Sequence, residues 1–366
     1  MTIPHTPDVL VIGGGVIGCA IARELAGPRR VVLVDRGPIG GEASSAAAGV
    51  LAVASGDDDG ERLALRTASL ALFPDLADAL RAETDIDVGF ARCGVVALAC
   101  TDAEAAAHAG RAAQRLAEGF RAEVLDARDV TALEPAASAA LRGGALFPDD
   151  ASVVAERFVA ALADSARRRG ATIVPGAPVL AIERDGERVT RVRIGQDWIA
   201  PACVVLATGA WGTSAIPDLD VGVDLVPVRG QMIALRPARG VGHVLAAGDA
   251  FLVPRAHGAV WVGATFEEVG FEKMVTAAGL RTLAAHVERL APAMLGAPIV
   301  RAWAGLRPFC RRGGPILGRP PTLDNVLVAL GHHRNGILLA PVTAQTIRAY
   351  VDGVPAPSHA LPFLLG

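Results

Sequence analysis

A run of three glycines near the start of the chain constrains its fold more than any other feature. Residues 8–26, DVLVIGGGVIGCAIARELA, predict a short apolar strand, a tight turn and a helix whose apolar positions recur every three or four residues. Gly13, Gly15 and Gly18 form the pattern G-x-G-x-x-G: one glycine makes the turn, one admits a pyrophosphate, and one lets helix and strand pack closely. The stretch therefore predicts a dinucleotide site at the helix N-terminus, and a glycine turn that only packs is the alternative.

The residues that follow favour FAD as the dinucleotide. A second strand, VVLVD, ends at Asp35, 22 residues after Gly13, where a carboxylate can accept hydrogen bonds from ribose hydroxyls. Residues 41–51, GEASSAAAGVL, are small where an NAD domain would normally continue into another helix and strand. Such a loop suits a ligand that extends towards a second domain, as FAD does, although a flexible linker would look the same. A later strand runs into Thr208 and Gly209 and should bring backbone against the nucleotide again.

Composition excludes several classes of protein. The chain has 366 residues, a net charge of −3 and 52% hydrophobic residues, enough for one large core or two interleaved domains. Its arginines form only short clusters, so we expect no nucleic-acid surface. The five cysteines show no C-x-x-C spacing, which argues against disulfides and a metal site and fits a reducing cytoplasm. Without a signal peptide or a long apolar run, we expect a soluble cytoplasmic protein with no membrane partner.

Periodicity and turn residues predict the other elements. We expect helices at 57–85, 103–119 and 126–135, from a Ser152 cap to 170, at 275–291 and from 336 onwards, and strands at 93–100, 171–175, 179–184, 188–194, 202–207, 225–235, 251–255, 259–266 and 299–306. Longer alternating strands begin after Val223. We therefore expect a discontinuous nucleotide-binding domain (1–86, 148–226 and 307–366) and a sheet-rich substrate domain (87–147 and 227–306).

A second polar stretch, GHHRNGILLAP at residues 331–341, lies against the start of the last long helix. The helix should open at Gly336, so the amides of Gly336, Ile337 and Leu338 would be free to face the pyrimidine edge of a flavin ring. Arg334 precedes this helix and Arg307 is expected in the turn after a strand. Either guanidinium could bind a substrate carboxylate through two parallel hydrogen bonds, although a strand-end arginine in solvent is the alternative for Arg307.

These segments together resemble the D-amino acid oxidase (DAO) family of FAD-dependent oxidoreductases, and within it the glycine oxidases of the thiamine-biosynthesis type. The similarity runs through nearly the whole chain, in the motifs VIGGGVIGCAIA, GGEASSAAAGVL, PVLAIERDG, ATGAW, PVRGQM, VPR, VGAT, AGLRP and GHHRNGILLAP. It implies an α/β fold with a Rossmann-like, glutathione-reductase-like FAD-binding domain. The second, α+β domain would be built on a mostly antiparallel sheet.

The resemblance also implies an activity. A small amino acid or amine with a carboxylate would lose its α-hydrogen as hydride to flavin N5, water would hydrolyse the imine to a 2-oxo acid, and dioxygen would reoxidise the flavin and give hydrogen peroxide. A D-amino acid or secondary-amine (sarcosine-type) oxidase is the alternative, as is a dehydrogenase with another electron acceptor. The family favours a homotetramer, so we expect a homo-oligomer. Cys310 does not fit the position of covalent attachment, so we expect non-covalent FAD.

By the same resemblance, Arg307 binds the substrate carboxylate and Arg334 assists. The FAD contacts would fall on Val16, Ile17, Asp35, Arg36, Ala43, Ser44, Ala48, Gly49, Val50, Val179, His332, His333, Arg334, Asn335, Gly336, Ile337 and Leu338. The two histidines would shape the site rather than transfer protons. Phe251 and Phe266 stand where glycine oxidases have tyrosine and methionine, which implies a more apolar substrate cavity than glycine needs.

Overall fold

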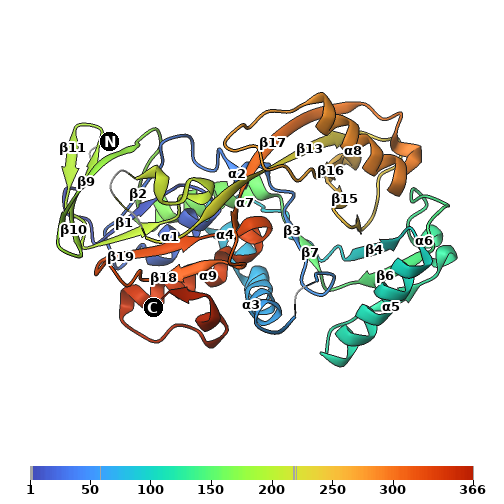
Figure 1. Ribbon diagram of the computed structural model, residues 1–366, viewed down its shortest axis with the longest axis horizontal. Coiled ribbons are helices and arrows are strands. Elements are labelled where there is room, and N and C mark those ends of the chain that lie inside the picture. Colours follow the sequence, from blue (N-terminus) through green and yellow to red (C-terminus); the bar gives the residue numbers. More distant parts are fainter. Residues whose placement is uncertain (1–2, 58, 217–218, 220, 366) are drawn as a thin grey trace.

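Two sheets organise the chain (Figure 1). The computed structural model describes residues 3–57, 59–216, 219 and 221–365. One sheet has seven strands in the order β20-β18-β19-β12-β1-β2-β8, and the other has eight in the order β17-β13-β16-β15-β14-β4-β6-β5. The predicted fold class is confirmed, because the first sheet is mostly parallel and the second mostly antiparallel.

The seven-stranded sheet is buried on both faces. Its strands are β1 (Val9–Ile12), β2 (Val31–Val34), β8 (Thr172–Val174), β12 (Cys203–Leu206), β18 (Ile316–Gly318), β19 (Val326–Leu330) and β20 (Leu364–Leu365). Side chains alternate along β1, so Val9 and Val11 join the core under the helices, and Leu10 and Ile12 join the core on the other face. Continuous apolar strands of this kind are typical of parallel sheets covered on both sides.

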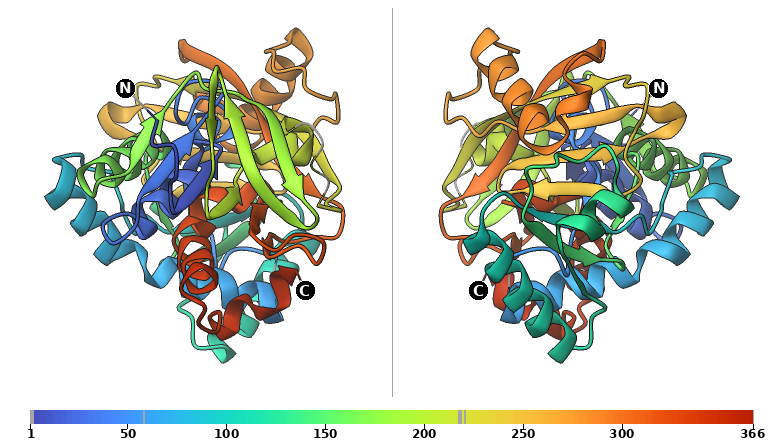
Figure 2. Two further views of the ribbon diagram at one scale, coloured as in Figure 1. Left: turned by 90° about the vertical axis from the view of Figure 1, so that its left-hand side faces the viewer. Right: turned by 90° about the vertical axis from the view of Figure 1, so that its right-hand side faces the viewer.

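Different elements cover the two faces. On one face α1 (Val16–Leu25) packs against α7 (Ala155–Arg168) and α9 (Gly336–Asp352). The left view of Figure 2 shows the red C-terminal helix next to the blue N-terminal strands. A three-stranded antiparallel sheet supplies apolar side chains to the other face; its strands are β9 (Val179–Asp185), β10 (Arg188–Ile194) and β11 (Asp197–Ile199).

The seven-stranded sheet, which carries the predicted dinucleotide turn, is called the nucleotide sheet below. The eight-stranded sheet extends away from it (Figure 1). Its strands are β4 (Val95–Ala99), β5 (Glu123–Leu125), β6 (Gly143–Phe147), β13 (Leu225–Leu235), β14 (Val244–Ala247), β15 (Ala250–Pro254), β16 (Val260–Gly263) and β17 (Ile299–Cys310). Helix α8 (Ala277–Leu290) packs on β13, β15 and β16. In Figure 1 α5 (Asp102–Ala117) and α6 (Ala127–Leu133) lie beside β4 and β6, at the opposite end of the molecule from β9–β11.

Several predicted elements differ in the structure. The helix expected at 57–85 is two helices, α3 (Gly60–Ala71) and α4 (Phe73–Thr84), because Pro74 lacks an amide hydrogen and starts a new helix; Asp58 lies outside the described residues. The small-residue loop contains α2 (Ala43–Ala46) and the short strand β3 (Val50–Leu51), which pairs with β7 (Ala151–Ser152).

Two errors concern the ends of elements. Ser152 is not a helix cap: it lies in β7, and α7 begins at Ala155 without a side-chain cap. The strand expected to end at residue 306 continues to Cys310, because β13 pairs with it along that whole length. Arg307 therefore lies inside a strand rather than in a turn. The domain division stays a proposal, and its limits near residues 226 and 307 fall inside β13 and β17.

Glu83 links three helices on the face of the nucleotide sheet. From α4 its carboxylate accepts hydrogen bonds from Arg23 of α1, at 2.9 Å, and from Ser165 and Arg169 at the end of α7. Burial alone would raise the pKa of Glu83, but the hydrogen bonds from Arg169 and Ser165 and the charge of Arg23 lower it to about 2. The network therefore stabilises the fold only while the carboxylate is ionised.

We expect Glu83→Gln to reduce the free energy of unfolding by about 2 kcal/mol at pH 7, less than the full pKa shift implies because the carboxylate is partly exposed. The folded-state pKa lies below the ordinary value of 4.5, so this stabilisation is complete above about pH 4.5 and is lost as pH falls towards 2. Urea unfolding at pH 7 and pH 3 measures the difference between wild type and variant, which should shrink at pH 3. A constant difference would contradict the assignment, and Asp78→Asn, an exposed acid of α4, is the control.

Candidate active site

The glycine turn between β1 and α1 has two glycines that packing requires and one that it does not. A Cβ on Gly13, whose φ is +110°, would lie 2.3 Å from the carbonyl oxygen of Ala207, and one on Gly18 would lie 1.8 Å from the oxygen of Gly13. At Gly15 the nearest atom to such a Cβ is the Ser44 hydroxyl, at 3.2 Å. The open side of Gly15 is therefore where a ligand can approach the backbone.

The polar end of β2 packs against this turn. The Asp35 carboxylate accepts hydrogen bonds from the amides of Gly14, at 2.6 Å, and Gly37, at 2.7 Å. Its protein partners are thus the turn amides, and its ribose contact stays a prediction. Arg36 stacks on the indole of Trp211, with the guanidinium carbon 3.9 Å from the ring centroid.

Two other predicted nucleotide segments converge on the same place. The amide of Ala177, just before β9 begins at Val179, donates to the carbonyl of Asp35 at 2.7 Å. The amide nitrogen of Thr208 would lie 3.1 Å from a Cβ on Gly13, and Gly209 follows with φ of +57°. The structure therefore brings β2, the start of β9 and the end of β12 together around the glycine turn that follows β1.

The small-residue segment connects the two sheets. Ser44 of α2 accepts a hydrogen bond from the amide of Val16 at 2.9 Å. On its other side α2 packs on β17: a Cβ on Gly305 would lie 2.4 Å from Cβ of Ala46, and the Trp303 indole donates to the Ala46 carbonyl at 3.2 Å. The segment thus contacts the N-terminus of α1 and the strand that carries Arg307.

The residues after α2 are held by backbone contacts. Gly49 has φ of +71°, and a Cβ there would lie 2.1 Å from the Val153 carbonyl oxygen. The Ala48 carbonyl accepts a hydrogen bond from Arg255, and Val50 pairs with Ser152. These contacts fix the path of the predicted FAD-binding loop.

The second polar stretch meets the glycine turn. A Cβ on Gly336 would lie 3.9 Å from Cγ1 of Val16, so the N-termini of α9 and α1 are neighbours. Helix α9 begins at Gly336 as predicted, and no side chain caps its N-terminus in the described chain. The Asn335 side chain instead accepts a hydrogen bond from Arg66 at 2.8 Å. The first turn of α9 is therefore open to an acceptor from outside the protein.

Burial keeps both histidines of the stretch neutral. His332 is buried, with Nε2 2.9 Å from the Thr343 hydroxyl, and burial lowers its pKa to about 3. Burial, together with the charges of Arg307 and Arg334, lowers the pKa of His333 to about 4. The His333 ring packs edge-on against those of Phe309, at a centroid distance of 4.9 Å, and Phe266, at 6.0 Å, and these two rings also contact each other, at 6.5 Å. Neither imidazole carries a charge at neutral pH.

Arg307 is a partly buried cation on β17. Its guanidinium lies across Gly230 of β13, where a Cβ would be only 2.2 Å from Nη2, and Nη1 donates to the Thr265 carbonyl at 3.0 Å. Burial, and then the charge of Arg334, lowers the pKa of Arg307 to about 10. The side chain is still charged at neutral pH but has lost much of its hydration, which favours binding of an anion.

A polar network supports the carbonyl that holds Arg307. The Thr265 hydroxyl accepts from the amide of Gln231 at 2.9 Å, and the Gln231 side chain donates to Glu267 at 2.7 Å. Glu267 also accepts two hydrogen bonds from the buried side chain of Arg229. These residues fix the segment that follows β16, so the guanidinium of Arg307 has a defined position.

Arg334 and the two phenylalanines complete the site. Arg334 is 44% exposed at its side chain and forms an ion pair with Asp249, Nη2 to Oδ1 2.6 Å. Phe266 is 45% exposed beside His333. Phe251 packs in an apolar cluster with Ala48, Trp261 and Trp303.

Sequence reasoning assigned no site role to several residues that the structure places here. Asp249, Thr265 and Arg255 contact predicted site residues, and Trp211 stacks on Arg36. Asp249 could be recognised only as a turn residue between two strands, and the sequence contained no signal for its partner. Gln231 was part of the motif PVRGQM, but without a role.

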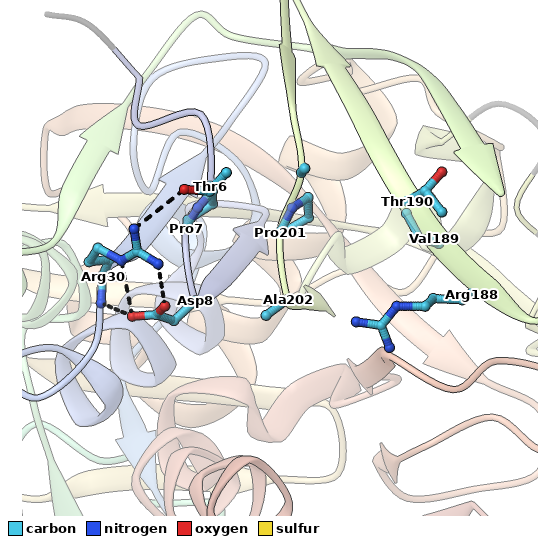
Figure 3. Close-up of a pocket in the computed structure, with 10 residues that line it drawn as sticks. Thr6, Pro7, Asp8, Arg30, Arg188, Val189, Thr190, Pro201 and Ala202 are labelled. Carbon is cyan, nitrogen blue, oxygen red and sulfur yellow. Dashed lines mark hydrogen bonds and ion pairs between the residues drawn. The ribbon is translucent and has the colours of Figure 1, made fainter. Parts of the chain in front are cut away.

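Other candidate sites lie apart from this one. Cys310 is buried in the apolar core between the seven-stranded and three-stranded sheets. A hollow of about 300 Å³ near the N-terminus is lined by Thr6, Asp8, Arg30, Arg188 and neighbours, and includes no predicted site residue (Figure 3). In the described part of the chain, no cluster of three or more His, Cys, Asp or Glu could hold a metal, and no helix has the length and apolarity to cross a membrane.

Comparisons with known proteins show the family of the chain. Residues 8–349 match the family described as DAO: FAD dependent oxidoreductase. The chain is 34% identical to glycine oxidase of Geobacillus kaustophilus over 366 residues, 99% of this chain and 97% of that protein. It is 35% identical to the bifunctional protein ThiO/ThiG of Synechocystis over 93% of this chain and 51% of that protein. The crystal structure of the G. kaustophilus glycine oxidase superposes with a TM-score of 0.94 at 33% identity and covers 99% of each chain.

Gly15, which is expected to face the ligand, and Gly18, which packing requires, give a test of the ligand site. We expect Gly15→Ala to fold but to retain at least tenfold less FAD, because its methyl group would lie 3.2 Å from the Ser44 hydroxyl and narrow the approach of a ligand to the backbone. Gly18→Ala should instead lower the thermal unfolding temperature of the FAD-free protein, because its methyl group collides with the Gly13 carbonyl. FAD binding is measured by fluorescence titration and folding by circular dichroism. Equal FAD affinity of Gly15→Ala and wild type would place the diphosphate elsewhere.

Proposed function

Because the chain belongs to the DAO family of FAD-dependent oxidoreductases, we propose that it oxidises a small amino acid or amine that carries one carboxylate. The substrate would be held through its carboxylate, with the α-carbon facing the flavin. The products would be a 2-oxo acid and an amine or ammonia. The observation that carries this proposal is the partly buried, charged guanidinium of Arg307 on a strand that packs against the small-residue loop beside the glycine turn.

The protein residues fit FAD at two places. The open side of Gly15 and the amides at the start of α1 suit the diphosphate. The uncapped N-terminus of α9, with Gly336 at its first position, suits the pyrimidine edge of the ring. When bound, FAD accepts the hydride from the substrate and passes the electrons on to dioxygen. The positive end of α9 would stabilise the negative charge that reduction places nearby.

The protein itself would act mainly by orientation. Arg307 anchors the carboxylate by two parallel hydrogen bonds, and the network behind Thr265 keeps that anchor in place. His332 and His333 are neutral at physiological pH and have no carboxylate partner in the described chain, so we assign neither a proton-transfer role. Arg334 adds positive potential at the entrance. The amine enters the reaction unprotonated, and its proton is lost to solvent before binding.

The aromatic side chains near Arg307 favour a substrate with a small apolar substituent on its α-carbon or its nitrogen. Phe266, Phe309 and His333 form an aromatic group with centroid distances of 4.9–6.5 Å beside Arg307. Phe251 contributes no hydroxyl and packs with Trp261 and Trp303. We therefore propose that an N-alkyl group or a small apolar side chain is accepted, in addition to glycine.

Further parts of the proposal concern the enzyme as a whole. We propose dioxygen as the electron acceptor, a homo-oligomer, with a tetramer as the first expectation, and a cytoplasmic location. We also propose that FAD is held without a covalent bond, which the burial of Cys310 in the apolar core supports. Peroxide formation in air, light scattering and acid precipitation of the protein test the acceptor, the assembly and the mode of attachment.

Anaerobic reduction of the FAD-loaded protein tests the function directly. Glycine, sarcosine, N-ethylglycine, D-alanine, D-proline and a larger D-amino acid are mixed with the protein, and bleaching of the flavin absorbance is followed. We expect rapid bleaching by at least one small substrate and faster reduction by N-ethylglycine than by the larger D-amino acid. No bleaching by any of them would contradict the proposed function. Bleaching without peroxide formation in air would identify a dehydrogenase with another acceptor.

We expect Arg307→Ala to lower kcat/KM for every carboxylate substrate by at least 100-fold, because the anchor provides two charged hydrogen bonds of about 1.5–3 kcal/mol each. Arg307→Lys should recover only part of the loss, since an ammonium cannot make the parallel pair. FAD content should be unchanged in both variants, which separates substrate binding from cofactor binding. Wild-type kinetics in Arg307→Ala would remove this arginine from the site.

A further inference from the structure

The ion pair between Arg334 and Asp249 lies on the exposed side of the site, since the two side chains are 44% and 64% exposed. Asp249 lies in the turn between β14 and β15, and its carboxylate is 2.6 Å from Nη2 of Arg334. Its backbone carbonyl accepts a hydrogen bond from the amide of Ala264 at 3.2 Å. Ala264 precedes Thr265, whose carbonyl holds Arg307. The turn is therefore attached to the same segment that positions the carboxylate anchor.

Arg307 forms no ion pair with any carboxylate of the described residues. Arg334, Asp249 and Glu267 all act electrostatically on Arg307, and His333 beside it is neutral at physiological pH. Glu267 is already occupied, because it accepts hydrogen bonds from Arg229 and Gln231. Arg229 also lies 3.6 Å from the exposed carboxylate of Glu272.

Asp249 offsets the charge of Arg334, as Glu267 offsets the charge of Arg229. Among the described residues, the Arg307 guanidinium donates a hydrogen bond only to the neutral carbonyl of Thr265. The site thus presents one guanidinium that is free to bind an anion and a second that the protein itself has paired.

We propose that Asp249 is a specificity-determining residue that restricts the site to substrates with a single carboxylate. This inference rests on the proposed function, since it concerns the same anchor. A monocarboxylate brings one negative charge to Arg307. A dicarboxylate would bring a second charge towards Asp249, where it meets a like charge and an arginine that is already engaged. Removing the Asp249 charge would release Arg334 as a second carboxylate ligand.

Two unreactive ether acids that differ by one carboxylate group test this selectivity by calorimetry on the FAD-loaded protein. Methoxyacetate has one carboxylate and diglycolate has two, and neither contains an amine to oxidise. We expect wild type to bind methoxyacetate more tightly. In Asp249→Asn the affinity for diglycolate relative to methoxyacetate should rise about tenfold, the equivalent of one additional charged hydrogen bond. In the double variant Asp249→Asn with Arg334→Gln this gain should disappear.

Glu156→Gln is the matched control. It removes one charge and releases Arg301, which has side-chain exposure of 45% and a 2.7 Å ion pair, close to the values of Arg334. The ratio of the two affinities should stay at the wild-type value in this variant. An unchanged ratio in Asp249→Asn would overturn the inference, as would a gain that survives the loss of Arg334 or the absence of binding of either acid. Because calorimetry needs no turnover, failure of flavin reduction by amino acids would contradict the proposed function separately.

Discussion

The meeting of two helix N-termini is the constraint on which the rest of this structure depends. Helices α1 and α9 begin within van der Waals reach of each other, at Val16 and Gly336, although 320 residues separate them in the chain. Their partial positive charges point into a common region and would repel each other if nothing negative were present. The region therefore favours an anionic ligand, and glycines at both helix starts give it access to the backbone.

The eight-stranded sheet packs against α2, near the start of α1, through very small residues. These residues let the backbones of α2 and β17 approach closely. Ala46 of α2 packs directly on Gly305 of β17, and Gly230 of β13 leaves room for the guanidinium of Arg307. A larger residue at either glycine would push β17 away from the nucleotide sheet or displace the arginine. The small size of Ala46, Gly305 and Gly230 thus sets the distance between the proposed cofactor site and the proposed substrate anchor.

The electrostatics of the substrate side follow from burial. Arg307 keeps its charge even though burial lowers its pKa, because that pKa remains well above neutral, whereas both adjacent histidines lose theirs. The charges of Asp249 and Glu267 act on Arg307, but the ion pairs of these two carboxylates are with the neighbouring arginines, Arg334 and Arg229. In the proposed site Arg307 is therefore the cation that would bind one substrate carboxylate.

Local sequence was sufficient for much of this protein. The glycine pattern at Gly13 to Gly18 and the apolar run before it determined a strand, turn and helix, because those residues satisfy the geometry within one βα unit. Gly336 marked the start of the last helix for the same local reason. Resemblance across the whole chain pointed to the family, and the comparisons confirmed it.

Only the tertiary structure decided which distant groups meet. Sequence patterns predicted that the strand ends before Arg307, because no local signal showed that β13 pairs with β17 as far as Cys310. Asp249 was an ordinary turn residue until the fold placed it against Arg334, 85 residues further along the chain. Periodicity and turn propensities record interactions between near neighbours, whereas ion pairs and burial depend on contacts that exist only once both sheets have assembled.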